Sequence, residues 1–196
     1  MARYDGHPIE GLTIDLKPGG ASKDLEGMSS EKIDFSKINF LIVDPNRLMG
    51  SMIRDVLITL DAHHIDRARN CEGAIQILRQ GRIDVLITEW DLQAEQNGMD
   101  LVRWIRNDAG SPNRLLPVIL LTANSEEEYV VRARDAGVNE FVAKPYTVQS
   151  FYTRLASAIA RPRQFVRVDG YFGPDRRRRR DADYPGPERR KNPEDN

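Results

Sequence analysis

Five short segments, separated by segments with helical periodicity, constrain the fold of this chain more than any other feature. Four of them are predominantly apolar, which is typical of strands buried on both faces of a parallel sheet, and the second is weaker. Helices must then cover both faces of the sheet. The alternation predicts an α/β fold of the flavodoxin-like, doubly wound kind, with a five-stranded parallel sheet in the order 2-1-3-4-5. The predicted strands are residues 38–43, 64–68, 83–88, 117–121 and 141–143.

The segments between these strands carry apolar residues three and four positions apart, which predicts amphipathic helices. Ser125, followed by three glutamates, is a typical helix start, and Gly137 is a typical helix end. The predicted helices lie at residues 48–60, 74–78, 98–107, 125–137 and 148–159.

Composition outside these elements divides the chain into three parts. Residues 1–35 carry four basic and seven acidic residues with scattered Gly, Pro and Ser, so we expect a flexible acidic arm. Residues 36–162 form the folded domain. Residues 163–196 carry ten basic and seven acidic residues, and we expect a disordered, arginine-rich tail there. This tail has too few apolar residues for a DNA-binding domain.

No apolar run approaches the roughly 20 residues that span a bilayer, so we expect no transmembrane segment. The first ten residues are polar and broken by Gly6 and Pro8, unlike a secretory signal. Cys71 is the only cysteine, which excludes an internal disulfide and favours a cytoplasmic location.

Polar residues stand where four of the predicted strands end: Asp44, Glu89, Thr122 and Lys144. In a doubly wound sheet the carboxyl ends of the strands meet at one edge, where ligands bind. Two acids, a hydroxyl and an ammonium are the groups that would build a phosphoryl-accepting pocket. One carboxylate would accept the phosphoryl group, others would hold Mg²⁺, and the hydroxyl and ammonium would bind phosphoryl oxygens.

Six short fragments follow one another along residues 37–161: Val43-Asp44, Thr88-Glu89-Trp90-Asp91-Leu92, Gly98-Met99-Asp100, Leu121-Thr122-Ala123, Asp135-Ala136-Gly137 and Phe141-Val142-Ala143-Lys144-Pro145-Tyr146. Together they make this segment resemble the response-regulator receiver domain (CheY-like), because all occur in the order and spacing of that family. The resemblance implies a signalling module of two-component or phosphorelay systems rather than an enzyme with a separate substrate.

Two positions depart from the family pattern and predict an atypical receiver, or pseudo-receiver. The resemblance places the phospho-accepting aspartate at Glu89, whose carboxylate reaches about 1.5 Å further. It places the second of two adjacent acids at Pro45, which has no side-chain oxygen. Asp44, Glu89 and Asp91 remain as weak Mg²⁺ candidates, so we expect no cofactor, because Mg²⁺ demands near-ideal octahedral oxygens. Asp91 is also the other candidate phosphoacceptor, in the loop after the strand.

The remaining pocket leaves several interpretations open. Glu89 would pair with Lys144 without a metal, and would either mimic the active state or be tolerated in a degenerate pocket. In receivers that this chain resembles, the strand-four threonine, here Thr122, moves together with the switch aromatic at Phe141, which lacks a hydroxyl in this chain. Alternatively, Asp44 caps a helix, Thr122 satisfies a backbone group, and Glu89–Lys144 is an ion pair without function.

The tail contains one motif twice, thirteen positions apart: residues 171–177 and 184–190 both follow the pattern Y-x-G-P-D/E-R-R. Each copy would offer an aromatic face and paired guanidinium groups, which bind phosphates and planar rings. Candidate ligands are an acidic protein surface, a nucleic acid or anionic membrane, and a cyclic dinucleotide; a solvated tail without a ligand is the alternative. The candidate binding residues are Tyr171, Arg176, Arg177, Arg178, Tyr184, Arg189 and Arg190.

We therefore predict a stand-alone atypical receiver that acts by protein–protein contacts and has no catalytic output. Signalling partners, or a second copy of the chain, would bind the face formed by the fourth helix, the fifth strand and the fifth helix, residues 127–161. Two alternatives remain: an effector that binds a cyclic dinucleotide or another anion through the tail, and a conventionally phosphorylated receiver that uses Asp91 or Glu89.

Overall fold

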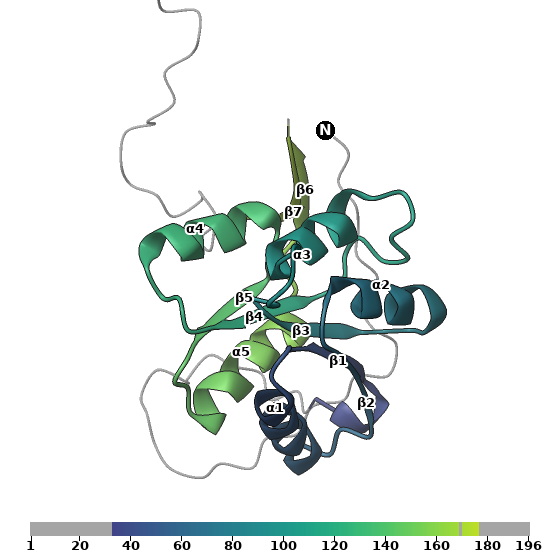
Figure 1. Cartoon of the computed structure of the whole chain (residues 1–196), viewed down its shortest axis with the longest axis vertical. Helices are drawn as coiled ribbons and strands as arrows, with labels where there is room; N and C mark the ends of the chain where they lie inside the picture. The colour runs from purple at the N-terminus through teal and green to yellow at the C-terminus, as the bar shows by residue number, and fades with distance from the viewer. Residues whose placement is uncertain (1–32, 169, 177–196) are drawn as a thin grey trace, which may run out of the picture.

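The computed structural model describes residues 33–168 and 170–176. Five parallel strands form one sheet in the order β2-β1-β3-β4-β5 (Figure 1). This is the predicted flavodoxin-like topology, which the structure confirms. The strands are β1 (Asn39–Val43), β2 (His64–Ala68), β3 (Val85–Glu89), β4 (Val118–Thr122) and β5 (Glu140–Ala143).

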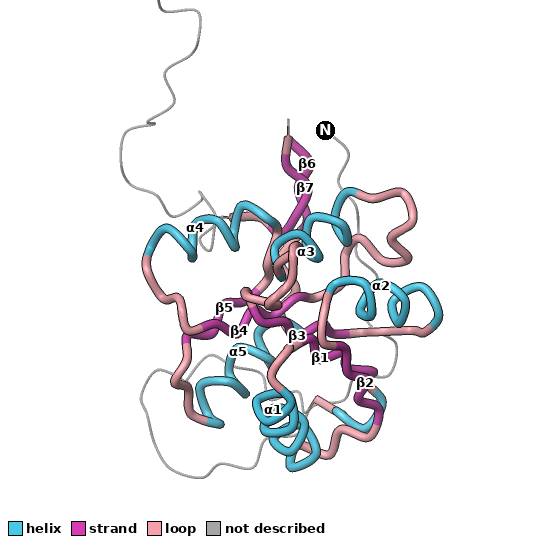
Figure 2. The backbone as a smooth tube through the Cα atoms, viewed as in Figure 1, coloured by secondary structure: helices cyan, strands magenta, loops and turns pink. Residues whose placement is uncertain are grey.

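Five α-helices of the described chain cover the sheet in two layers (Figures 1 and 2). Helices α1 (Arg47–Thr59) and α5 (Val148–Ala160) pack on one face. The other face is covered by α2 (Cys71–Gln80), α3 (Gly98–Asn107) and α4 (Glu127–Ala136). None of the helices in residues 33–168 and 170–176 is long and apolar enough to cross a membrane.

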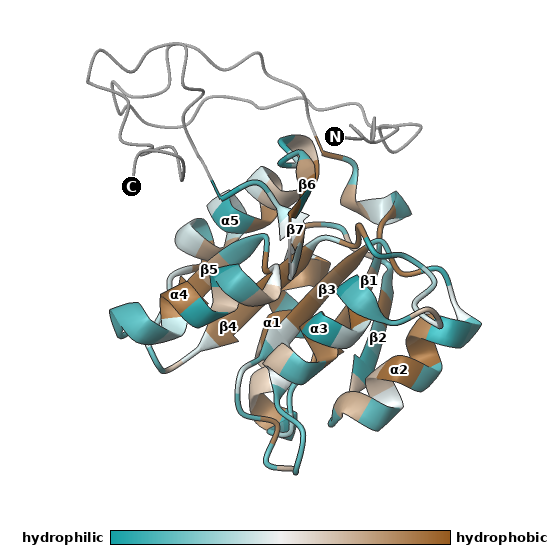
Figure 3. Cartoon of the chain, turned by 90° about the horizontal axis from the view of Figure 1, so that it is seen from above, coloured by the Kyte–Doolittle hydropathy of each residue, from teal (hydrophilic) through white to brown (hydrophobic). Residues whose placement is uncertain are grey.

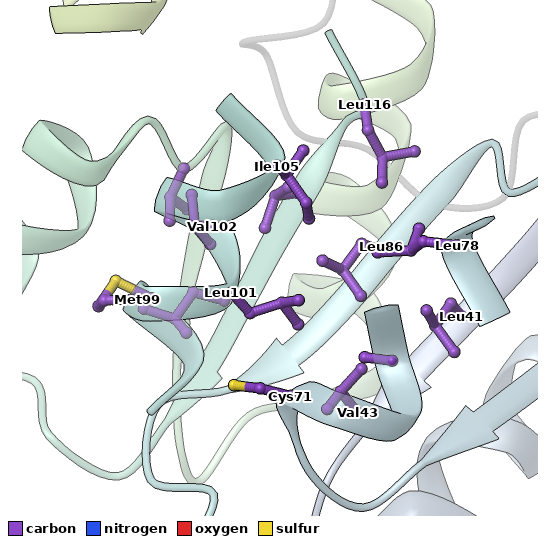
Figure 4. Close-up of a cluster of buried hydrophobic side chains, with 14 of the residues drawn as sticks. Leu41, Val43, Cys71, Leu78, Leu86, Met99, Leu101, Val102, Ile105 and Leu116 are labelled. Atoms are coloured by element: carbon purple, nitrogen blue, oxygen red, sulfur yellow. The ribbon is translucent and has the colours of Figure 1, made fainter. Parts of the chain in front are cut away.

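Each layer encloses its own hydrophobic cluster, because successive residues of a strand point to opposite faces of the sheet. Ile87 of β3 belongs to the cluster under α1 and α5, whereas its neighbour Leu86 belongs to the cluster under α2, α3 and α4. Figure 4 shows part of the second cluster, with Leu86 and Leu41 facing the side chains of α2 and α3. Strands β1, β3 and β4 are correspondingly apolar along most of their length, whereas the edge strand β2 is mostly polar (Figure 3).

Local sequence explains where several helices begin and end. Asn46, Asn97 and Thr147 accept hydrogen bonds from backbone N–H groups in the first turns of α1, α3 and α5. Helix α4 ends at Gly137, whose φ of +97° lies in the left-handed region that glycine adopts without strain. These helix starts set the loops that follow β1, β3 and β5, where the predicted site residues lie.

The residues before β1 pack more closely than predicted. Ile33 and Phe35 are buried, and the ring of Phe35 stacks on that of Phe40 with centroids 6.3 Å apart. A short 3-10 helix, η2 (Phe35–Lys37), leads into β1. The predicted flexible arm, residues 1–35, therefore extends too far by at least three residues, since 33–35 belong to the folded domain. Residues 1–32 lie outside the described part of the chain.

The segment after α5 also differs from the prediction. Strands β6 (Phe165–Val168) and β7 (Tyr171–Pro174) pair antiparallel, and β7 contacts α3 and α4 (Figure 1). A disordered tail from residue 163 onward is thus wrong for residues 163–168 and 170–176. The overlooked signal was a turn sequence, Asp169-Gly170, between two runs rich in aromatic and β-branched residues. The rest of the predicted tail, residues 177–196, lies outside the described residues.

Candidate functional site

The carboxyl edge of the sheet joins three of the four predicted polar side chains. Asp44 follows β1, Glu89 ends β3 and Lys144 follows β5. The ammonium nitrogen Nζ of Lys144 lies 2.5 Å from Glu89 Oε2 and 3.5 Å from Asp44 Oδ2. Two carboxylates therefore share one ammonium, in an arrangement we call the Lys144 network (Asp44, Glu89 and Lys144).

Both oxygens of the Glu89 carboxylate have hydrogen-bond donors. Oε2 accepts from Lys144, and Oε1 accepts from the backbone N–H of Trp90 at 2.7 Å. The backbone here is held as well, because the Thr88 hydroxyl donates to the Glu89 carbonyl oxygen at 3.0 Å. A Cβ atom on Gly98 would overlap that same carbonyl oxygen, so α3 can begin this close to β3 only with glycine. Glu89 is therefore fixed by its own loop and by Lys144.

Asp44 is buried, and its two carboxylate oxygens have different surroundings. Oδ1 accepts a hydrogen bond from the N–H of Asn46 at 2.8 Å, which supports the start of α1. Oδ2 is buried and has no hydrogen-bond partner among the described residues; Lys144 meets it at 3.5 Å as an ion pair only. A buried carboxylate oxygen without a donor is costly, so the charge of Lys144 is the main compensation for burying Asp44.

The pKa of Lys144 reflects opposing effects. Burial of the ammonium by itself lowers the pKa, but the hydrogen bond and charge of Glu89, and then the charge of Asp44, outweigh it. The pKa of Lys144 is consequently held above its usual value of 10.5. The ammonium is thus charged at neutral pH, as the two carboxylates require.

Thr122 and Asp91 take part in local turns rather than in the Lys144 network. The buried Thr122 hydroxyl oxygen accepts a hydrogen bond from the N–H of Asn124 at 3.2 Å. Asp91 is exposed, and its carboxylate accepts from the N–H of Gln93 at 2.8 Å. Within the described chain, neither side chain forms a hydrogen bond or ion pair with the network. The structure therefore brings together three of the predicted pocket residues and leaves these two apart.

The donor set at this edge does not fit a divalent metal ion. Pro45 follows Asp44 and has no side-chain oxygen, and the Asp91 carboxylate is engaged in its own loop. The ammonium of Lys144 lies within ion-pair distance of both remaining carboxylates, so a positive charge already neutralises one of them. Among the described residues, no three His, Cys, Asp or Glu side chains are grouped to hold a metal ion. The octahedral oxygen set that Mg²⁺ demands is therefore not assembled here.

Two aromatic side chains connect this edge to α4 and β5. Trp90, the residue after Glu89, is half-buried and packs edge-on against Tyr129 of α4, with ring centroids 5.1 Å apart. Phe141, the predicted switch aromatic, is half-buried on β5 and packs against the cluster under α2, α3 and α4. The Trp90–Tyr129 contact was not predicted, because nothing in the sequence relates two aromatics 39 positions apart.

An open hollow of about 300 Å³ lies beside β5 and the start of α5. Tyr146 lines this hollow and packs against Phe151, with ring centroids 5.8 Å apart. Burial raises the pKa of the Tyr146 hydroxyl above its usual range. The hollow belongs to the surface predicted to bind partners. Its lining residues are Phe141, Val142, Ala143, Pro145, Tyr146, Thr147, Ser150 and Arg154.

The first copy of the repeated motif is engaged within the protein. Tyr171 is buried, and its hydroxyl donates a hydrogen bond to the carbonyl oxygen of Pro174 at 2.8 Å. The Arg176 guanidinium carbon lies 4.0 Å from the centre of the Tyr171 ring, and its Nη1 lies 3.4 Å from Asp135 Oδ1. This differs from the expectation that both side chains are offered to an external ligand. The other predicted tail residues lie outside the described residues: Arg177, Arg178, Tyr184, Arg189 and Arg190.

A doubly wound sheet with acids, a threonine and a lysine at its carboxyl edge defines a signalling domain of the receiver class. Residues 40–156 match the family model of the response regulator receiver domain. The chain is 30% identical over 131 residues to the chemotaxis protein CheY-3 of Vibrio cholerae, covering 67% of this chain and 98% of that protein. It is 31% identical over 124 residues to the chemotaxis protein CheY of Pseudomonas aeruginosa, covering 63% and 98% of the two chains.

Solved structures agree on the fold. A two-component response regulator from Clostridium difficile superposes with a TM-score of 0.57 at 23% identity, covering 64% of this chain and 98% of that chain. The chain belongs to the response regulator receiver domain family, and its class of function is two-component signal transduction.

Proposed function

We propose that this chain is an atypical receiver that signals through protein contacts and is not phosphorylated in the usual way. The observation that carries the proposal is the Lys144 network, in which Glu89 occupies the end of β3 and binds the ammonium directly. Lys144 would otherwise be available to a phosphoryl group. The proposed setting is the cytoplasm, with no catalytic output from the chain itself.

The reason lies in the geometry of phosphoryl transfer, which depends on positioning and electrostatics. Glutamate extends the carboxylate by about 1.5 Å relative to aspartate. That extra reach lets Glu89 span to Lys144, and a carboxylate held in this way is not free to attack phosphorus. Pro45 removes one oxygen ligand, and the remaining donors do not fit Mg²⁺. Two losses at one pocket compound each other.

The contacts favour a fixed ion pair with Lys144, rather than a mimic of the active state, as the role of Glu89. A switch of the kind that links Thr122 to Phe141 would begin with a contact between the phosphoryl position and the Thr122 hydroxyl. Among the described residues, that hydroxyl forms no hydrogen bond with Glu89: its oxygen accepts from the N–H of Asn124, and both Glu89 oxygens accept from other donors. We infer that Glu89 acts as a permanent anionic partner of Lys144 and holds one conformation of the β5–α5 loop.

The proposed partner surface is the α4–β5–α5 face. The hollow beside β5 is lined by Ala143 and Pro145, the two chain neighbours of Lys144, so the Lys144 network adjoins this surface through the β5–α5 loop. A fixed Lys144 would therefore present a fixed surface to a signalling protein or to a second copy of the chain.

The experiment is an intact-mass measurement after incubation with Mg²⁺ and acetyl phosphate. The unmodified chain should gain no phosphoryl mass, whereas the double variant Pro45→Asp, Glu89→Asp should gain one. The double variant is the matched control, because it shows that the fold is competent when the two departures are reversed. A phosphoryl adduct on the unmodified chain would refute the proposal, and its position at Asp91 or Glu89 would identify the failed step.

A further inference from the structure

The β6–β7 hairpin covers a buried guanidinium at the amino edge of the sheet. Arg106 at the end of α3 is fully buried, and its Nη2 donates to the carbonyl oxygen of Leu116 at 2.8 Å and to Asn139 Oδ1 at 3.0 Å. Its Nε donates to the carbonyl oxygen of Gly137 at 3.1 Å, and the ring of Phe165 lies 5.0 Å from its guanidinium carbon. We call Arg106, Asp135 and Gly137 the α3–α4 socket.

Gly173 and Arg176 of the motif contact this socket, and Tyr171 and Pro174 hydrogen-bond to each other beside it. A Cβ atom on Gly173 would lie 3.0 Å from Gly137 Cα and 2.6 Å from the Tyr171 hydroxyl, so only glycine fits. Pro174 is buried and accepts the Tyr171 hydroxyl, and Arg176 bridges from the Tyr171 ring to Asp135. Tyrosine, glycine, proline and arginine are therefore the residues that dock the motif.

The second, variable residue of the motif can be proline, because the strand register leaves its backbone N–H out of the hydrogen bonds between β6 and β7. Phe172 is opposite Arg167, and the N–H of Asp175 donates to the carbonyl oxygen of Gln164. In an antiparallel pair the hydrogen-bonded positions alternate, so the pair 164/175 implies that 167/172 is not hydrogen-bonded. The N–H of residue 172 thus faces away from β6, and a proline there breaks no bond of the hairpin.

The second copy of the motif has proline at that position and keeps every docking residue. Tyr184, Gly186, Pro187 and Arg189 correspond to Tyr171, Gly173, Pro174 and Arg176, and Pro185 corresponds to Phe172. The residues that would correspond to β6 are different, because 178–181 are Arg-Arg-Arg-Asp where β6 has Phe-Val-Arg-Val. The second copy therefore has the docking side chains but no apolar strand of its own to pair with.

We propose that the α3–α4 socket has two alternative occupants within one chain, and that residues 184–190 can pair with β6 and dock in place of residues 171–176. The socket is thus a binding site for the Y-x-G-P-D/E-R motif, and one copy is always left undocked. This inference does not depend on the phosphorylation state of the chain, so the acetyl phosphate experiment and the test below fail independently.

Loop length sets the balance between the two occupants. Docking of the first copy closes a two-residue loop, 169–170, whereas docking of the second closes a fifteen-residue loop, 169–183. The closure probability falls as about the 3/2 power of loop length, which favours the first copy about 20-fold. Phe172 adds to this preference through its contacts with Phe165 and with the guanidinium groups of Arg114 and Arg167. The second copy should become the main occupant only when the first is disabled.

The test follows the socket by NMR in the full chain, using the Gly137 amide signal and hydrogen exchange of the Arg106 Nε–H. Gly173→Val disables the first copy; the Gly137 signal should move to a new position, while Arg106 stays protected by the second copy. Adding Gly186→Val should abolish that protection. A 20-fold preference for the first copy leaves the second copy in the socket in about 5% of molecules. Gly186→Val alone should therefore change the intensities of the wild-type signals by no more than about 5%.

Two further variants test whether the result depends on strain that valine introduces at position 173. Tyr171→Ala should behave like Gly173→Val, and Pro185→Ala, added to Gly173→Val at the variable position, should leave docking of the second copy intact. Identical Arg106 exchange in Gly173→Val and in the double variant would overturn the proposal. A Gly173→Val protein that sediments as a dimer would also overturn it, because the second copy would then dock on another chain.

Discussion

The two edges of the sheet each bury a cation among oxygens, but they do so in opposite ways. At the carboxyl edge, Lys144 is held by two carboxylates, whose attraction raises its pKa despite burial. At the amino edge, the Arg106 guanidinium is surrounded by neutral carbonyl and amide oxygens. Burial lowers the pKa of Arg106, against a smaller opposing effect of Tyr171.

This difference separates two uses of a buried charge. The Lys144 network balances charge with charge, so its strength depends on pH and on every member of the set. The Arg106 site satisfies donors with acceptors across three segments, residues 114–116, 137 and 139, so it acts as a structural fastener. The first site is expected to change when Lys144 loses its proton, whereas the second is expected to change only when the hairpin leaves.

The largest expected effect on the free energy of unfolding comes from replacing Arg106. Arg106→Leu leaves several buried acceptors without donors and should lower the free energy of unfolding by about 3 kcal/mol or more. Urea denaturation of the full chain measures this. Arg103→Leu, on the exposed side of the same helix where Arg103 pairs with Asp100, is the matched control and should cost less than about 1 kcal/mol. Equal costs for the two variants would show that the Arg106 hydrogen bonds contribute little.

The next effect is the removal of the shared cation. Lys144→Met leaves Asp44 and Glu89 as neighbouring, poorly solvated carboxylates and should cost about 2 kcal/mol at neutral pH. Urea denaturation at neutral pH tests this, with Lys37→Met as control. Lys37 is exposed and pairs with Asp34 in solvent, so that variant should cost less. Equal costs for the two variants would contradict the charge balance.

A smaller effect should appear at alkaline pH. The pKa of Lys144 is raised in the folded state, so its stabilisation is complete below the unfolded value of 10.5 and is lost as the pH rises through the folded value above it. Glu89→Gln removes the main cause of this shift and should cost about 1 kcal/mol near neutral pH. The melting temperatures of the wild type and the variant should therefore converge as the pH rises through the folded pKa of Lys144, and a constant difference would contradict this assignment.

The smallest effect concerns the exposed contact of the hairpin. Asp135 and Arg176 retain 44% and 40% of their side-chain exposure, so solvent screens the pair. Arg176→Ala should cost about 0.5–1 kcal/mol from the ion pair and the stacking on Tyr171 together. Repeating the urea denaturation in 1 M salt should remove the ion-pair part only. A loss of several kcal/mol would mean that Arg176, rather than Arg106, fastens the hairpin.

Prediction from the sequence worked where one physical rule sufficed. Short apolar runs alternating with helical periodicity predicted the sheet order, and the ends of parallel strands predicted that Asp44, Glu89 and Lys144 meet. The prediction of a disordered tail was wrong for residues 163–168 and 170–176, because it was based on their arginine and Gly-Pro content. The turn between two strand-like runs was visible in the sequence, but its docking surface, formed by α3 and α4, was not.

The sequence by itself determined the fold class, the position of Glu89 at a strand end and the absence of an acid at position 45, since each depends on local pattern or residue type. Only the tertiary structure decided that Thr122 accepts from Asn124 outside the Lys144 network, and that Tyr171 is buried rather than offered to a ligand. The burial of Arg106 was decided there too, because its acceptors come from segments up to 33 positions away. Whether such groups meet depends on how the helices pack, which no local pattern specifies.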